Sequence, residues 1–291
     1  MTEQLSLEQL VEGVDELLSL PDVVLRANEL IDSQQADIDE IAEVIGLDPS
    51  LSAQLLKLVN SAFYNFPSRI DTISRAVTVI GVNELRSLIL SASAVSVFNK
   101  IAPGTIDMDD FWFRSVYVGL AAKEVAADKR KAELMFLMGL LHDVGKIVLF
   151  NKAPDLANRV LGEAQQTGRP LHLIEKEQLG YSSTDISAEL LKSWHVAESL
   201  WQPIGFMYDD NAPAEYARDS RILRLSTRLA DCNEPEVKNI SPDKLGQLKR
   251  DDGLLQSLSL NQQDIDDITE AVSASCFEVL NVINPDSMLV F

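Results

Sequence analysis

Residues 131–150 read KAELMFLMGLLHDVGKIVLF, an apolar segment in which a His-Asp pair stands at positions 142 and 143. Apolar residues recur there every three or four positions, which predicts one helix over Lys131–Phe150 with a bend at the pair. The densest apolar run, Leu134–Leu141, is far shorter than the roughly 20 residues of a membrane-spanning helix. The segment therefore predicts a core helix of a globular protein.

The same spacing recurs along most of the chain, and the alternation of apolar and polar residues typical of strands is scarce. Asp48 and Pro49 are expected to start a helix as N-cap and first-turn proline, and Asn83 is expected to cap another. Further helices are predicted over residues 37–45, 49–63, 84–98, 109–128, 155–167, 171–179, 184–194, 196–208, 213–232 and 263–282. The predicted fold class is therefore all-α, a multi-helix bundle.

The composition allows a sizeable core beneath an acidic surface. Of 291 residues, 46% are hydrophobic and 24% are charged, which excludes global disorder. Lysine and arginine number 25 against 45 aspartate and glutamate, so the formal net charge is −20. Such a charge disfavours a wide contact with nucleic acid or with an anionic membrane, and neither is expected as a partner.

Cysteine usage and the N-terminal sequence bear on the compartment. Cys232 and Cys276 are too few for a disulfide framework and form no metal-binding pair, so buried thiols in a reducing compartment are expected. The N-terminal sequence MTEQLSLEQLVEGVDELL is acidic and amphipathic, unlike a signal peptide. The expected location is cytoplasmic.

His142 and Asp143 lie in the run GLLHDVGK, Gly139–Lys146. Imidazole nitrogen and carboxylate oxygen both bind divalent metals, so adjacent His and Asp at a helix bend can bind one ion together. By this run the chain resembles the HD superfamily of metal-dependent phosphohydrolases. The N-terminal half is similar to the bacterial HDOD branch of that superfamily. The similarity lies in Leu20-Pro21, IGLDPSLSAQLLKLVNSAFYNFP (Ile45–Pro67), ISRA (Ile73–Ala76) and Ile80-Gly81.

The resemblance, over roughly residues 15–210, implies a set of metal ligands from which this sequence departs. Positions where the family carries histidine hold other residues here, namely Arg114, Ser183 and the pair Met207-Tyr208. The ligands that remain by resemblance are His142, Asp143 and, in Leu229-Ala-Asp231, Asp231. The two other histidines, His172 and His195, are expected at the surface or at the edge of the core.

Three ligands are the minimum for a catalytic metal that keeps an open water position. Arg114 disfavours such a site, because a guanidinium cannot lose its proton and repels a dication. Magnesium could still bind through Asp143 and Asp231 with several waters. Two alternatives stay open for Arg114. It pairs with Asp143 or Asp231 as a fixed charge in place of the metal, or it points to solvent beside Asp110. If the pair is buried, Arg114→Ala should cost several kcal/mol of stability.

Other basic residues have a functional and a plain interpretation. Lys146 is either a partner for a phosphate oxygen or a helix-end lysine exposed to water, and the second is preferred. Four arginines one turn apart form a stripe that could receive an anion or an acidic partner segment. The alternative is a solvated face with local pairs such as Arg228 with Asp231. The stripe consists of Arg218, Arg221, Arg224 and Arg228.

The segment Asp37–Phe63 resembles a helix-turn-helix only superficially. Its second helix offers only Lys57 to neutralise phosphates, so packing explains it better than DNA binding. Asn60 and Ser61 are polar residues in an apolar stretch, and we expect them to hydrogen-bond helix ends within the fold.

Together these features predict a two-lobed helical protein. An N-terminal lobe would cover residues 1–105, an HD-like lobe 106–210, and a C-terminal helical extension packed on it 211–291. The HDOD resemblance implies a signal-transduction regulator that binds a signalling protein or a small ligand. The depleted set of metal ligands favours a regulator without catalysis and without a cofactor. The alternative is a phosphohydrolase acting on a nucleotide or cyclic dinucleotide. In it, His142, Asp143 and Asp231 would hold Mg²⁺, Mn²⁺ or iron.

Overall fold

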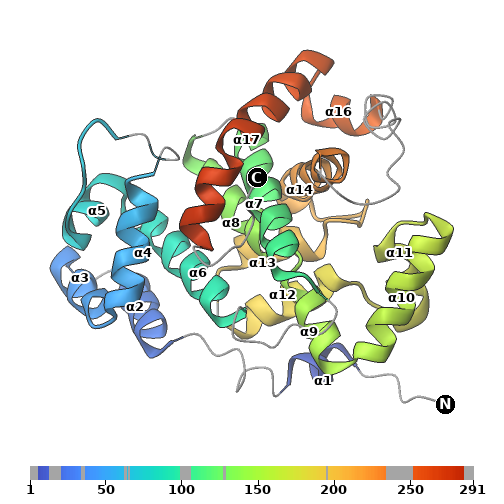
Figure 1. Cartoon of the computed structure of the whole chain (residues 1–291), viewed down its shortest axis with the longest axis horizontal. Coiled ribbons are helices and arrows are strands. Elements are labelled where there is room, and N and C mark those ends of the chain that lie inside the picture. Colours follow the sequence, from blue (N-terminus) through green and yellow to red (C-terminus); the bar gives the residue numbers. More distant parts are fainter. Residues whose placement is uncertain are drawn as a thin grey trace. The chain divides into compact units, whose positions relative to one another are not determined.

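The computed structural model describes residues 6–12, 21–33, 37–61, 64, 66–98, 106–126, 129–194, 196–233 and 252–284. These residues form helices joined by turns and loops, with no strand among them (Figure 1). The chain divides into two compact units. Unit 1 comprises Met1–Leu18 and Ile101–Val272, and unit 2 comprises Ser19–Lys100 and Ser273–Phe291. The all-α class predicted from the sequence is confirmed, whereas the lobe boundaries at 105 and 210 stay a prediction.

Unit 2 is built around five consecutive helices. Helix α3 packs on α2 and α5, and α6 packs on α2, α4 and α5. Their shared core includes Ile41, Leu55, Leu85 and Ile89, which are fully buried or nearly so. The helices are α2 (Asp22–Ser33), α3 (Ile38–Gly46), α4 (Pro49–Val59), α5 (Ile73–Ile80) and α6 (Val82–Phe98).

Polar side chains tie the helix ends of unit 2 as the sequence predicted. Asp48 caps α4 by accepting the backbone N–H groups of Ser50 and Leu51 at 2.9 and 3.0 Å. Asn60 binds the backbone of Ile70 twice, donating to its carbonyl at 2.6 Å and accepting its N–H at 2.8 Å. These bonds satisfy backbone groups that the loop after α4 would otherwise leave unpaired. Packing therefore accounts for the polar residues of this segment.

Unit 1 contains the helices that carry the His-Asp pair. Helix α7 lies against α8 and α14, and α12 packs on α9 and α13. Helices α10 and α11 pack on each other, and α1 contacts α9 and α12. The helices are α1 (Leu7–Val11), α7 (Met108–Ala126), α8 (Lys129–Leu141), α9 (Val144–Lys152), α10 (Pro154–Thr167), α11 (Leu171–Leu179), α12 (Ser183–Ser193), α13 (Glu198–Gly205), α14 (Ala214–Asn233) and α16 (Asp252–Leu258). Helix α17 (Gln262–Ile283) begins in unit 1 and ends in unit 2.

Two glycines let α7 and α8 approach closely. A Cβ atom added to Gly139 would lie 2.5 Å from the Cα of Gly119, and one added to Gly119 would lie 2.8 Å from the carbonyl oxygen of Phe136. Only a residue without a side chain fits at such a crossing. The contact fixes α8, and so the His-Asp pair at its end, against α7.

Two helix predictions were wrong in detail. The single helix expected over Lys131–Phe150 is two helices, because α8 ends at Leu141 and α9 begins at Val144. Asn83, expected as an N-cap, lies inside α6. None of the described helices combines the length and apolar content that spanning a membrane requires.

Candidate functional site

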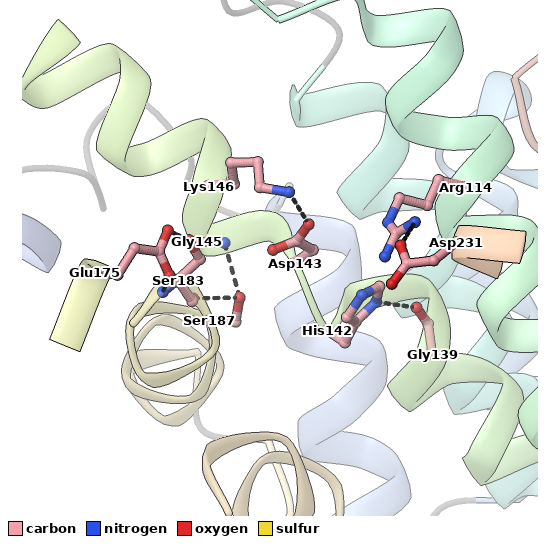
Figure 2. A network of polar contacts seen from close by, with 10 residues as sticks. All are labelled: Arg114, Gly139, His142, Asp143, Gly145, Lys146, Glu175, Ser183, Ser187 and Asp231. Carbon is pink, nitrogen blue, oxygen red and sulfur yellow. Dashed lines mark hydrogen bonds and ion pairs between the residues drawn. The ribbon is translucent and has the colours of Figure 1, made fainter. Parts of the chain in front are cut away.

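The break between α8 and α9 holds His142 and Asp143 inside unit 1. His142 is only 2% exposed and Asp143 is 8% exposed. Figure 2 shows both beside Arg114 of α7 and Asp231 of α14, with Lys146 of α9 directed at Asp143. The structure thus brings together all five residues that the sequence singled out at or near the motif.

The His142 ring is a neutral hydrogen-bonding group with one free ring nitrogen. Its Nδ1 lies 2.6 Å from the carbonyl oxygen of Gly139. Because a carbonyl only accepts, Nδ1 must carry the proton, which leaves a lone pair on Nε2. Burial lowers the pKa of His142 to about 4, and the charge of Arg114 contributes to that decrease. At neutral pH the ring therefore offers an acceptor at Nε2 and no charge.

Asp143 forms an ion pair with Lys146, whose ammonium group donates to its Oδ2. Burial raises the pKa of Asp143, but Lys146, His142 and Arg114 lower it more, so the carboxyl group ionises below its usual range. The preference for Lys146 as a lysine exposed to water was wrong, because its side chain is 23% exposed and is held by Asp143.

Arg114 forms an ion pair with Asp231, with Nη1 2.6 Å from Oδ1 (Figure 2). Of the alternatives left open by the sequence, the structure has the pair and not the guanidinium in solvent. The side chain of Arg114 is 20% exposed and that of Asp231 is 47% exposed, so water screens the pair. Such a pair contributes about 1 kcal/mol or less. The loss of several kcal/mol on Arg114→Ala was expected only of a buried pair, and this pair is not buried, so a small loss is expected instead.

A second polar network lies beside the pair, at the first turn of α9, and joins three helices. Glu175 of α11 accepts two hydrogen bonds from Ser183 of α12, one from the backbone N–H at 2.9 Å and one from the hydroxyl group. Ser187 donates to the carbonyl of Ser183 at 3.0 Å and accepts the N–H of Gly145 at 2.8 Å. The network, drawn in Figure 2, fixes the first turn of α9 to α12 and α11. Ser183, where the resemblance noted from the sequence led us to expect histidine, therefore has a structural role here.

Glu175 is 2% exposed, and its burial raises the pKa of the carboxyl group although the bonds from Ser183 oppose the increase. We expect Glu175→Ala to lower stability by about 1–3 kcal/mol, because two buried donors of Ser183 lose their acceptor. Glu175→Gln keeps an acceptor and carries no charge, so its stability should equal or exceed that of the wild type.

Urea unfolding of both Glu175 variants across pH tests this expectation. A raised pKa in the folded state means that the wild type loses stability as pH rises above the unfolded-state value of about 4.3. Glu175→Gln should therefore match the wild type at acidic pH and gain on it at alkaline pH. Equal losses in Glu175→Gln and Glu175→Ala would show that the carboxylate charge itself is required.

The sequence did not predict a ring stack at the edge of this site. Tyr208, where the resemblance led us to expect part of a histidine pair, lies flat against the ring of His172, with centroids 3.7 Å apart and an interplanar angle of 0°. Burial and the charge of Asp143 raise the pKa of Tyr208, so its hydroxyl stays protonated. Burial, with Lys176 and Arg224 next in effect, lowers the pKa of His172 to about 4. The sequence offered one hint of this stack, since Tyr208 stands at a position where the resemblance led us to expect a ligand of the site. His195 lies outside the described residues.

The predicted arginine stripe on α14 divides into two pairs. Arg218 and Arg221 are exposed, whereas Arg224 is half-buried and bonded to residues of the same chain. Its Nε donates to the carbonyl of Met207 at 2.8 Å, and its Nη1 lies 2.7 Å from Asp210. Arg228 is half-buried, and its positive charge acts on His172. A role of the stripe in binding an anion or a partner stays a prediction.

The arrangement of these residues does not fit a divalent cation. Arg114 neutralises Asp231 and Lys146 neutralises Asp143. Of the three metal ligands expected by resemblance, His142 is therefore the one that keeps a lone pair, on Nε2, for a metal. A dication would have to displace both internal cations and enter against their charge. Over the described ranges, no group of three or more His, Cys, Asp or Glu residues is placed to hold a metal ion.

Comparison with known proteins agrees with this fold. The family model for the HDOD domain matches residues 17–209. A solved structure from Shewanella amazonensis SB2B, named "Putative phosphohydrolase", is 26% identical, with a TM-score of 0.71 over 94% of this chain and 96% of its own. An HDOD domain protein with unknown function from Geobacter sulfurreducens is 24% identical, with a TM-score of 0.71 over 99% of both chains.

A curated relative from Treponema pallidum, an uncharacterized protein, is 25% identical over 208 residues, which are 71% of this chain. The match spans 40% of the length of that relative. The solved structures share the helical architecture, and the curated relative adds sequence similarity over most of the chain.

Proposed function

This chain belongs to the HDOD domain family, and on that premise we propose that it is a signal-transduction regulator that binds a protein partner or a small ligand. In this proposal it works without a metal and without catalysis, because its own side chains supply the positive charge that an HD hydrolase takes from a metal. A solved structure from Marinobacter aquaeolei VT8, named "Putative signal transduction protein", is 19% identical, with a TM-score of 0.67 over 94% of this chain and 60% of its own, and its name supports such a role.

The observation that carries the proposal is the pairing of both motif carboxylates with cations of the chain. Arg114 binds Asp231, and Lys146 binds Asp143. Asp143 without its partner would demand a metal or a proton, because a buried ionised group without compensation is costly, whereas the half-exposed Asp231 is also served by water. Here the demand is met internally, so the helices that meet at the site can keep their arrangement without a bound ion.

The second candidate is a metal-dependent phosphohydrolase acting on a nucleotide or cyclic dinucleotide. The lone pair on His142 Nε2 and the name of the Shewanella amazonensis structure favour it. Such an enzyme would need the Arg114–Asp231 and Lys146–Asp143 pairs to open. The cytoplasmic location and the absence of a nucleic-acid partner, both expected from composition, stay predictions.

Metal analysis of the purified full chain, followed by hydrolysis assays, separates the two candidates. We expect substoichiometric metal and no hydrolysis of bis-p-nitrophenyl phosphate or of cyclic dinucleotides with added Mn²⁺, Mg²⁺ or Fe²⁺. One equivalent of metal, together with turnover that His142→Ala abolishes, would establish the hydrolase instead. Arg114→Ala is the matched variant, since freeing Asp231 should increase any affinity for Mn²⁺ rather than decrease it.

A further inference from the structure

Unit 2 contains a cavity of about 450 Å³ between α2, α3 and α6. A volume of roughly 300–1,000 Å³ is typical of sites for small molecules. The cavity belongs to the unit that does not carry His142, so it is separate from the site described above. Its lining residues are Leu30, Ile31, Asp32, Ile41, Val82, Asn83 and Arg86.

The wall of the cavity combines aliphatic side chains with three polar ones, the guanidinium group of Arg86, the carboxylate of Asp32 and the amide of Asn83. Leu30, Ile31, Ile41 and Val82 supply the apolar part, and no aromatic ring is among the lining residues. A flat base such as adenine would therefore find no ring to stack on. The wall suits a compact hydrocarbon group instead.

Positive charge in the cavity comes from two sources on α6. Val82 and Asn83 belong to the first turn of α6, where backbone N–H groups have no carbonyl of their own helix to bond and where the helix dipole favours an anion. Arg86 lies one turn further on the same face as Val82. The helix end and the guanidinium thus reinforce each other at one place in the cavity.

Arg86 is incompletely satisfied. Its Nη2 donates to Asp32 Oδ1 at 2.6 Å, but the buried Nε has no hydrogen-bond partner among the described residues. A buried donor without an acceptor costs free energy, and a guanidinium has the geometry to bind a carboxylate through two parallel hydrogen bonds. The side chain of Asp32 is 65% exposed, so it is weakly held and can yield Arg86 to a second carboxylate.

We propose that this cavity binds a small aliphatic carboxylate. Its carboxylate group pairs with Arg86 at the first turn of α6, and its hydrocarbon chain contacts Leu30, Ile41 and Val82. A cationic ligand fits less well, because Asp32 is already neutralised by Arg86 and the helix end repels positive charge. The proposal is independent of the metal-free function argued for unit 1.

Calorimetric titration of the full chain with 4-methylpentanoate tests the proposal. The neutral amide of the same acid and the cation 3-methylbutylammonium are the comparison ligands. We expect the carboxylate to bind, the amide to bind at least about tenfold more weakly, and the ammonium not to bind. Absence of carboxylate binding, or equal binding of acid and amide, would overturn the proposal.

Substitutions locate the binding site. Arg86→Gln should weaken binding of 4-methylpentanoate about tenfold or more, and Arg86→Lys should weaken it less because it keeps the charge and loses the fork. Asp32→Asn removes the competing carboxylate and should strengthen binding. Arg26→Gln, an exposed arginine of α2 that does not line the cavity, is the control and should change nothing.

Loss of binding in Asp32→Asn, or binding unchanged in both Arg86 variants, would refute the assignment. Asp32→Asn keeps the test decisive even if Arg86→Gln fails to fold. Removing the Asp32 carboxylate should strengthen binding of a carboxylate ligand and weaken binding of an ammonium ligand.

Discussion

Gly145→Ala should destabilise unit 1 by about 3 kcal/mol or more. A Cβ atom at this position would lie 2.1 Å from the carbonyl oxygen of Ser183 and 2.6 Å from the backbone nitrogen of Ser187. Both are backbone atoms of α12, so no side-chain rotation relieves the contact and the first turn of α9 must move away. The movement also breaks the hydrogen bond from the N–H of Gly145 to Ser187.

Gly162→Ala is the matched control for Gly145→Ala. Gly162 also lies inside a helix of unit 1, α10, but a Cβ atom there would meet nothing within 4 Å. Replacing an unconstrained helix glycine with alanine stabilises by roughly 0.5–1 kcal/mol. Urea unfolding followed by far-UV circular dichroism should therefore give effects of opposite sign. Similar midpoints for the two variants would show that α9 and α12 are further apart than the structure has them.

Local sequence rules predicted much of the helical framework. The helix expected over 171–179 coincides with α11. Helix α10 begins one residue before the expected 155–167, and α14 begins and ends one residue after the expected 213–232. Gly180 ends α11 and Pro154 begins α10. Start and stop residues that act within a few positions of the chain were therefore sufficient to predict the bounds of these helices. The Asp48-Pro49 start of α4 is a further example.

The break at His142 and Asp143 could not be located by periodicity, because apolar spacing continues through it. The His142 ring binds the carbonyl of Gly139, a group that a continuous helix would bond to its backbone, and Gly145 must fit against Ser183 of another helix. The first requirement is local, but the second comes from packing between segments distant in sequence, which periodicity does not register. For the same reason, the His172–Tyr208 stack was not predicted. The Lys146–Asp143 pair joins residues three apart, and it was missed because Lys146 was expected to face water.

Within the site, the sequence predicted which residues meet but not how their charges are balanced. His142, Asp143 and Asp231 were named by resemblance, and Arg114 was named because it replaced an expected ligand. Whether Arg114 would face Asp231 or solvent depends on where α7 and α14 cross, and that crossing is set by packing along both helices. The cavity of unit 2 had no signal in the sequence, since its wall comes from three helices that each read as ordinary core.

Lys146→Met should have the second large effect, a loss of about 3 kcal/mol at neutral pH. Methionine keeps much of the apolar stem but leaves the carboxylate of Asp143, 8% exposed, without its ion partner. Asp143→Asn should cost less, because the Lys146 ammonium that remains is partly exposed and can reach water. The order of the two losses distinguishes a buried anion that needs a cation from an ordinary surface pair.

The double variant Asp143→Asn/Lys146→Met and the pH dependence complete the argument. With neither charge present, the loss should be smaller than the sum of the two single losses, with a coupling of about 1–3 kcal/mol.

In the wild type the lowered pKa of Asp143 contributes stability above the unfolded-state value of about 3.9, and this is lost as pH falls through the folded-state pKa. In Lys146→Met, burial dominates and raises that pKa, so its deficit against the wild type should be full at neutral pH and shrink toward pH 4. Urea unfolding in EDTA, which keeps a metal from replacing the lysine, measures this, with the double variant as the reference that lacks the titrating group. A deficit that is constant across this pH range would mean that Lys146 stabilises the site through packing and not through the charge of Asp143.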